Sequence, residues 1–215
     1  MITKLLLAAG GDGILLKETT DGRSCLSEAC RNGHAAVVEV LLGAGGEALL
    51  DRATRDGRSC LRLACERGHV DVVRMLLESL GPTLLHLRPD DGGACLLAAC
   101  GSGHADVVAA LVGAGGGACR QRTWWDRCGG GDSGLGGRAA GRACLRAACE
   151  GGHARVVAAL LRAGGNGLVK AGGGGGELYV EIARRLGHGE VEALLLAAVA
   201  VDRPAPLQDG PRAGL

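Results

Sequence analysis

Aromatic side chains are almost absent from this sequence, which contains no Phe, one Tyr and two Trp among 215 residues. It also contains forty glycines. Compact globules normally rely on aromatic side chains in their cores, so this composition disfavours an ordinary globule. The chain is nevertheless long enough to bury a sizeable core. Leu, Val, Ala and Cys are the residues that must build it.

The chain also lacks an excess of charge of either sign. Its 24 basic and 23 acidic residues leave a formal net charge of +1, and Lys occurs only as Lys4, Lys17 and Lys170. A nearly neutral chain has no general attraction to duplex nucleic acid or to an anionic membrane. We therefore expect neither nucleic acid nor a membrane as a partner.

Long hydrophobic runs are missing as well. The longest, ALLLAAVAV at 193–201, is far shorter than the ~18 residues that suggest a membrane span. The N-terminal MITKLLLAAGG has a five-residue apolar run, whereas a signal peptide needs a core of roughly 7–15 residues. These lengths predict no membrane span and no export, and hence a cytoplasmic protein, with the nucleus left open.

What the sequence does contain is an internal repeat, marked by the dipeptide Gly-His. Its histidines are His34, His69, His104, His153 and His188, at spacings of 35, 35, 49 and 35 residues. The spacing of 49 equals the period of 35 plus an insertion of 14. A Gly stands twelve residues before each His, and Asp precedes it in the first three copies, which predicts a tight turn.

Two short amphipathic helices are predicted in each copy, one on either side of Gly-His. The first covers SCLRLAC at 59–65 and its equivalents, and the second begins at Val37, Val72, Val107 or Val156. Their apolar residues form one wide stripe on each helix. About 13 residues such as GAGGEALLDRATR at 43–55 are predicted to be a Gly-rich connector. Helices this short are marginal alone, so neighbouring copies must bury them.

The register divides the chain into one repeat domain, 1–201, and a flexible C-terminal tail, 202–215. The predicted units are a half repeat at 1–20 and repeats at about 21–55, 56–90, 91–125, 126–174 and 175–201. The insertion, 127–140, belongs to the fourth repeat and is expected to project from a hairpin tip.

The segment DGRSCLRLACERGHVDVVRMLLE at 56–78 resembles the ankyrin repeat, with Gly, Leu, Ala, Gly-His, the Val pair and the Leu pair at the family spacing. The resemblance covers about 1–201 and implies an all-α, ankyrin-type helix-turn-helix solenoid with long Gly-containing connectors or hairpins. Two features depart from the family. The period is 35 instead of about 33, and Ser/Ala-Cys-Leu replaces Thr-Pro-Leu-His, which weakens the helix cap at Ala94 and Ala143. Tetratricopeptide and pentatricopeptide repeats have similar lengths, but they fill the period with helix.

Eight of the ten cysteines follow the register, as Cys25 and Cys30 and their equivalents. Five residues apart on a helix, two side chains point about 140° apart, so such a pair can neither chelate an ion nor form a disulfide. Equivalent cysteines of adjacent repeats are also expected to be too far apart for a disulfide, which needs Cα atoms within about 7 Å. We predict small buried side chains in a reducing compartment. Cys119 and Cys128, outside the helices, are the two that could be exposed or pair with each other.

No catalytic or cofactor site emerges from the pattern. In a solenoid, equivalent histidines lie roughly 10 Å apart, whereas zinc needs ligands at about 2.0–2.3 Å. Each His ring is therefore expected to bridge to the neighbouring hairpin. The run GGGGG at 172–176 lacks the strand and the Gly-Lys-Ser of a phosphate loop. With no nucleophile, base and orienting group at workable spacing, we expect no enzyme, no cofactor and no metal.

The resemblance implies a monomeric protein-interaction module that binds its partner along the concave face and the hairpin tips. By register, the residues placed there are Arg23, Arg31, Asn32, Arg55, Arg58, Arg67 and Arg142. Their Arg bias suits an acidic partner segment. Trp124 and Trp125, directly before the insertion, are candidate anchors. Two alternatives stay open: these residues are only a solvated face, or the chain is a structural or functionally relaxed fragment with no specific partner.

Overall fold

The computed structural model describes residues 18–50, 54–80, 89–116, 135–164 and 175–200, and these residues form ten helices and no strand. The helices come in consecutive pairs, and each pair spans one repeat. Their bounds are α3 Cys25–Arg31 and α4 Ala35–Leu50; α5 Cys60–Arg67 and α6 Val70–Leu80; α8 Pro89–Gly101 and α9 Ala105–Gly116; α11 Leu135–Glu150 and α12 Ala154–Gly164; α14 Gly175–Arg185 and α15 Gly189–Ala200.

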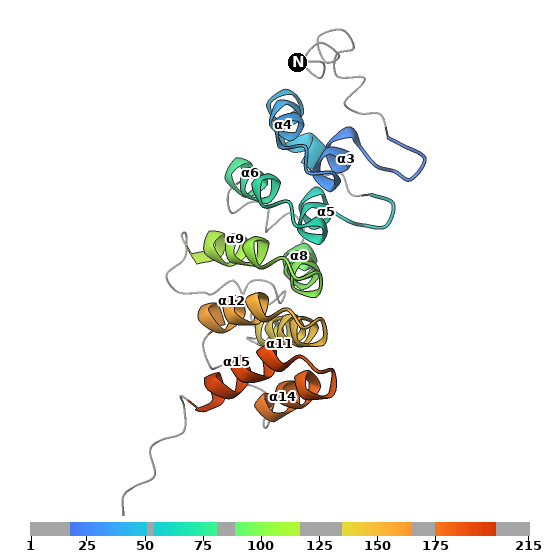
Figure 1. The fold of residues 1–215 in the computed structure, drawn as a ribbon. Coiled ribbons are helices and arrows are strands. Elements are labelled where there is room, and N and C mark those ends of the chain that lie inside the picture. Colours follow the sequence, from blue (N-terminus) through green and yellow to red (C-terminus); the bar gives the residue numbers. More distant parts are fainter. Residues whose placement is uncertain (1–17, 51–53, 81–88, 117–134, 165–174, 201–215) are drawn as a thin grey trace, which may run out of the picture.

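The pairs stack into two parallel columns (Figure 1). One column holds the first helices, α3, α5, α8, α11 and α14, and the other holds the second helices, α4, α6, α9, α12 and α15. Each helix contacts its partner within the pair and its equivalent in the next pair. This arrangement confirms the predicted all-α, ankyrin-type helix-turn-helix solenoid.

The core runs the length of the stack and is built from small and aliphatic side chains. In every complete copy, the first helix buries a Leu or Val and an Ala, and the second helix buries a Val and a Leu. In the second repeat these include Leu61, Ala64, Val73 and Leu76, all at most 3% exposed. Neighbouring helices approach closely enough for such side chains to fill the space between them, which explains how the chain folds with so few aromatic residues.

Ser24 caps the N-terminus of α3 and Ser59 caps that of α5, and a hairpin turn precedes each cap. The Ser24 hydroxyl accepts the Ser27 N–H, and the Ser59 hydroxyl accepts the Arg62 N–H, both at 3.2 Å. Gly22 and Gly57 have φ angles of +70° and +72°, which the predicted tight turns require. The turn prediction is therefore confirmed in these two repeats.

The same prediction is wrong in the third repeat, where Gly92 of the Asp-Gly pair lies inside α8, and the equivalent Gly141 and Gly176 lie inside α11 and α14. These repeats carry Ala94, Ala143 and Leu178 in place of the capping Ser, so no capping side chain sets the start of the helix at that position. In α8, Pro89 stands at the first position, where its fixed φ and missing N–H suit a helix. Part of the insertion, 135–140, is likewise the start of α11, so this part does not project as a loop. The residues 127–134 lie outside the described part of the chain.

The predicted connector is also too long. Residues 43–50, predicted as Gly-rich connector, are the second half of α4. The segment Glu-Ala-Leu-Leu at its end consists of strong helix formers, and these offset a cost of about 1 kcal/mol for each helical Gly. Among the described residues, no helix is long and apolar enough to cross a membrane.

Candidate partner-binding face

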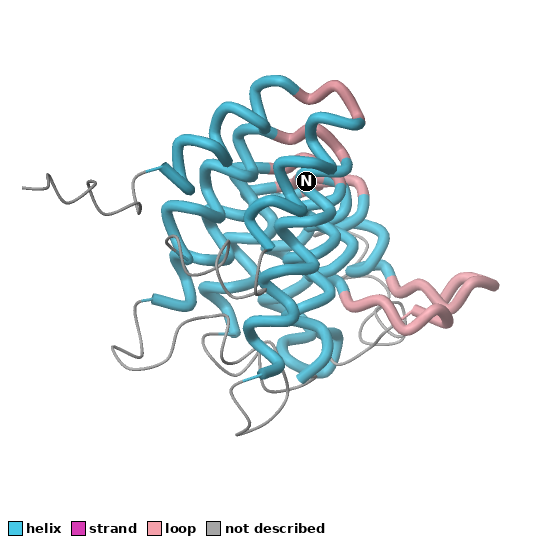
Figure 2. The backbone as a smooth tube through the Cα atoms, turned by 90° about the horizontal axis from the view of Figure 1, so that it is seen from below, coloured by secondary structure: helices cyan, strands magenta, loops and turns pink. Residues whose placement is uncertain are grey.

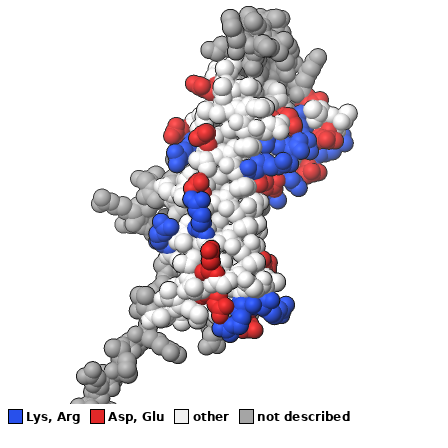
Figure 3. Space-filling view, in the orientation of Figure 1, with Lys and Arg blue, Asp and Glu red and all other residues white. Residues whose placement is uncertain are grey.

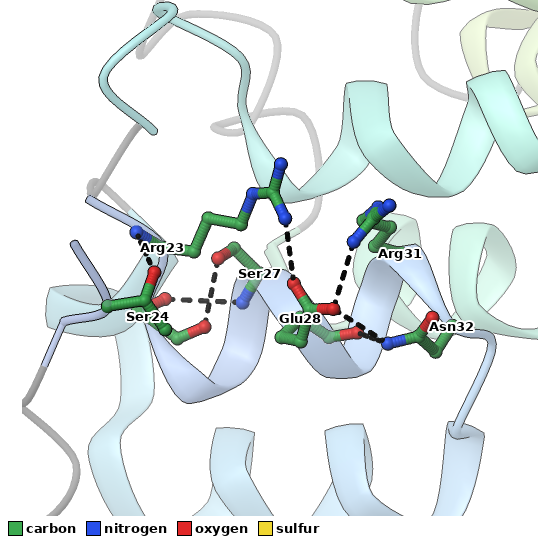
Figure 4. A network of polar contacts seen from close by, with 7 residues as sticks. Arg23, Ser24, Ser27, Glu28, Arg31 and Asn32 are labelled. Carbon is green, nitrogen blue, oxygen red and sulfur yellow. Dashed lines mark hydrogen bonds and ion pairs between the residues drawn. The ribbon is translucent and has the colours of Figure 1, made fainter. Parts of the chain in front are cut away.

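Three of the predicted binding residues meet at one carboxylate on α3, that of Glu28 (Figure 4). Arg31 Nη1 and Asn32 Nδ2 each donate a hydrogen bond to Glu28 Oε1 at 3.0 Å. Arg23 Nη1 lies 3.6 Å from Glu28 Oε2. Burial alone would raise the pKa of Glu28, but the Asn32 hydrogen bond and the charges of Arg31 and Arg23 lower it. Arg23 and Arg31 are thus held by an acid of their own repeat.

Two hairpin turns, at 19–23 before α3 and at 54–58 before α5, project together from the column of first helices (Figure 2). The backbone N–H of Arg55 donates to the carbonyl of Asp21 at 3.4 Å, which ties the second hairpin to the first. The side chain of Arg55 is exposed at this tip. The hairpins therefore form one continuous ledge beside α3 and α5.

A groove of about 520 Å³ lies between α5 and α8. Its lining residues are Arg58, Arg62, Glu66 and Arg67 from the α5 side and Ala94, Leu97, Ala98, Gly101 and Ser102 from the α8 side. One wall is charged and the other is apolar or small. Leu97 is 41% exposed, which places a large apolar side chain against solvent in this groove.

Charges of both signs crowd over α3 and α5 (Figure 3). Glu66 accepts hydrogen bonds from Arg58 at 3.0 Å and from Arg62 at 3.2 Å, so both guanidinium groups are paired. Within the described residues, no carboxylate forms an ion pair with Arg55 or Arg67, and both are exposed. On this face, Arg55 and Arg67 are therefore the cations that no ion pair among the described residues neutralises.

Leu97 is a residue of this face that the sequence reasoning missed. The equivalent positions of the other copies hold Ser27, Arg62, Arg146 and Glu181, so Leu97 alone is apolar there. That departure from the other copies was the available signal.

The remaining predicted residues do not join the groove. Arg142 is half-buried on α11, and its carbonyl accepts a hydrogen bond from Tyr179 Oη at 3.5 Å. Because α11 follows α8 in the column of first helices, Arg142 lies beyond the groove between α5 and α8. Trp124 and Trp125 lie outside the described residues.

Comparison with protein families agrees with this architecture. A family model described as ankyrin repeats (3 copies) matches residues 1–85, and one described as ankyrin repeats (many copies) matches residues 61–112. The chain belongs to the ankyrin repeat family. Ankyrin repeats generally mediate protein–protein interaction and are typically not catalytic. No curated protein matches the chain.

The Gly-His pairs of these ankyrin repeats join neighbouring copies, as predicted. The Nε2 atom of His104 hydrogen-bonds the Glu66 carbonyl at 3.2 Å, and His69, His153 and His188 make the equivalent bond to the preceding repeat at 3.0–3.2 Å. Each of these rings packs against the Gly of the Gly-His pair in the preceding repeat, and the φ of that Gly is positive. Across the described chain, no three His, Cys, Asp or Glu residues group as metal ligands.

The cysteines correct one part of the sequence reasoning. That reasoning compared equivalent cysteines of adjacent repeats, whereas the second Cys of one repeat interacts with the first Cys of the next. The interaction with the Cys60 thiol, together with burial, raises the pKa of Cys30. Cys95 and Cys144 raise the pKa of Cys65 and Cys100 in the same way. The prediction of burial is confirmed for every described cysteine except Cys25, which is half-buried.

Proposed function

We propose that this chain is a non-catalytic binding module that holds an extended segment of a partner protein in the groove between α5 and α8. The observation that most directly supports this proposal is that one groove contains both an exposed apolar side chain, Leu97, and a cation without an ion pair, Arg67. An apolar anchor beside a charged contact is the combination that binding hot spots favour.

The chemistry of the groove defines the segment that fits it. A small or aliphatic side chain would cover Leu97 and the adjacent Ala94 and Ala98. A carboxylate next to it would meet Arg67, and a second one, further along the ledge, would meet Arg55. Arg58 and Arg62 contribute less net charge because Glu66 already pairs with them. The proposed partner is therefore an apolar segment flanked by acidic residues.

The proposal includes a monomer in a reducing compartment, the cytoplasm, with the nucleus left open. The burial of seven helical cysteines as packing residues supports such a compartment. The mixed signs of the surface charges support binding of protein over nucleic acid.

A displayed peptide library selected against the immobilised chain tests this function. We expect the recovered sequences to converge on an apolar residue next to Asp or Glu. A synthetic peptide of that consensus should bind Leu97→Glu and Arg67→Glu at least about tenfold more weakly, or about 1.4 kcal/mol.

Two matched variants serve as controls. Leu196→Glu places the same charge at an exposed Leu of α15, and Arg74→Glu reverses an exposed Arg of α6 in the other column. Both should bind the peptide like the unmodified chain. Equal weakening by the control variants would remove the groove from the proposal. If the selected peptides share no consensus sequence, the result would favour the alternative of a structural or functionally relaxed chain without a specific partner.

A further inference from the structure

The groove between α5 and α8 carries more positive charge than one carboxylate can balance. Its charged wall holds three guanidinium groups, those of Arg58, Arg62 and Arg67, and one carboxylate, that of Glu66, which gives a formal net charge of +2. The residues of α8 that line the facing wall are uncharged. A single Asp or Glu of a partner would therefore leave half of this charge without a counter-charge.

Glu66 holds two of the guanidinium groups together and leaves most of their donors free. One of its oxygens accepts from Arg58 Nη1 at 3.0 Å, and the other accepts from Arg62 Nε at 3.2 Å. A guanidinium group has five N–H donors. The side chains of Arg58 and Arg62 are 43% and 34% exposed, so a ligand in the groove can reach the remaining donors.

Short side chains on α8 provide the space for such a ligand. Ala94, Ala98 and Gly101 line the wall that faces the arginines, and the volume of about 520 Å³ is typical of a ligand pocket. Ser102 on the same wall is exposed and adds a hydroxyl donor. The groove therefore offers cationic donors on one side and a small, neutral wall on the other.

We propose that this groove selects a phosphate monoester, carried by a phosphoserine or phosphothreonine next to an apolar residue of the partner segment. The inference rests on the proposed function and specifies its acidic contact. A phosphate monoester at neutral pH carries a charge of about −1.5 to −2 and three acceptor oxygens, which match the net charge and the three guanidinium groups of the groove. All three cations are arginines, whose planar donor pairs fit phosphate oxygens.

Two ordinary carboxylates match this arrangement less well. In an extended segment successive side chains point to opposite faces, so only one of two neighbouring acidic residues would face the groove. Acidic residues two positions apart would both face it, but roughly 6.5–7 Å from each other. Arg58 and Arg62 instead meet at the two oxygens of one carboxylate, so their positive charge is concentrated at one place. One compact anion with two charges suits this place best.

The face of α3 provides an internal comparison. Arg23 and Arg31 likewise share one carboxylate, that of Glu28. The position equivalent to Arg67 holds Asn32, whose amide donates to the same carboxylate. This network has a net charge of +1 and no third guanidinium group. The charge that matches a phosphate monoester is therefore a property of the groove between α5 and α8.

The test compares peptides that differ at one residue. Pools of synthetic peptides with a central phosphoserine, Ser or Glu and randomised flanks are passed over the immobilised full chain. The consensus peptide of the phosphoserine pool is then made with each of the three central residues, and fluorescence anisotropy measures each Kd. We expect the phosphoserine form to bind at least about tenfold more tightly than the Glu form, and the Ser form to bind most weakly.

Variants of the chain assign this preference to the groove. Arg62→Gln and Arg67→Gln should each lower the preference for phosphoserine over Glu by at least about fivefold, because each removes a positive charge and donors to phosphate. Arg67 forms no ion pair among the described residues, so its replacement leaves the contacts of the stack intact. Arg74→Gln, at an exposed position of α6 in the other column, is the matched control and should change neither Kd.

The outcomes separate this inference from the proposed function. Equal affinity for the phosphoserine and Glu forms, with Leu97→Glu still weakening both, would overturn the phosphate preference and leave the binding function in place. Binding of none of the peptides would overturn both. Inorganic phosphate that displaces the phosphopeptide at equal concentration would show a simple anion site, which contradicts recognition of a phosphorylated segment.

Discussion

Arg184 and Glu192 form an ion pair, 2.8 Å between Nη2 and Oε1, at the last repeat of the described stack. In the four preceding repeats their positions hold a cysteine, from Cys30 to Cys149, and a valine, from Val38 to Val157, all fully buried. There the two side chains are covered by the next repeat. The exchange of an apolar pair for a charged one places an ion pair at the end of the stack, where stacked repeats meet water, although Leu178, Leu186, Leu196 and Val199 of the same repeat are exposed.

The first prediction follows from this cap. Arg184→Cys with Glu192→Val restores the side chains of the internal repeats and exposes an apolar end, so we expect concentration-dependent self-association. Sedimentation velocity should show the unmodified chain as a monomer and the double variant as a larger species. Glu190→Val, an exposed change on the same helix, is the control. A monomeric double variant would contradict the capping role.

The second prediction concerns the core of the second repeat. Leu76 is fully buried, so Leu76→Ala should lower the free energy of unfolding by about 2–5 kcal/mol, measured by urea denaturation. Leu97→Ala, at an exposed position, should change it by less than about 0.5 kcal/mol. Leu77 is only half-buried, and its replacement should have an intermediate effect. Similar costs for Leu76 and Leu97 would contradict this register.

The third prediction compares two glycines. Gly68 has a φ of +78°, and a Cβ there would lie 2.5 Å from Nδ1 of His104. Gly68→Ala should therefore destabilise the chain by more than about 1–2 kcal/mol, the cost of the left-handed backbone alone. Gly113 lies in α9 with open space around it, so Gly113→Ala should stabilise the chain by about 0.5–1 kcal/mol. Thermal unfolding of both variants measures the difference, and equal melting temperatures would refute it.

The fourth prediction is a pH dependence at Glu28. Its pKa is lower in the folded chain than in the unfolded chain, so the carboxylate stabilises the fold above the unfolded pKa of about 4.3. That contribution is lost as the pH falls through the folded pKa. Glu28→Gln should therefore be less stable than the unmodified chain at neutral pH, and the difference should shrink in acid. Glu39→Gln, at an exposed position of α4, is the control; a gap that stays constant with pH would argue against the network.

The fifth prediction concerns Trp124 and Trp125, the chain's two tryptophans. If they anchor the partner, their fluorescence should shift to the blue when the selected peptide binds, because the indole rings leave water. Trp124→Ala with Trp125→Ala should then weaken binding by about 2–4 kcal/mol and leave the melting temperature nearly unchanged. Blue emission in the free chain, with a lowered melting temperature in the double variant, would show instead that the pair is a packing element.

The sequence by itself determined the repeat, the two-helix unit and the residues that fill the core. The Gly-His spacing and the Val and Leu stripes recur at a fixed period, and periodic burial requires no knowledge of distant contacts. It also predicted that each histidine ring bridges to its neighbour. Arg23, Arg31 and Asn32 were placed on one face by register alone.

Only the tertiary structure decided how adjacent repeats meet. Cys60, at a non-equivalent position of the next repeat, raises the pKa of Cys30, and a comparison of equivalent positions does not show this interaction. The structure also places the start of α11 within the insertion and extends α4 through its glycines, where the repeat register predicted loop and connector. The exposure of Leu97 likewise required the stack, and the pairing of Arg58 with Glu66 within one repeat required the arrangement of the turn before α5. Pattern gives the periodicity of burial, but the crossing of neighbouring helices sets which side chains touch and which charges remain for a partner.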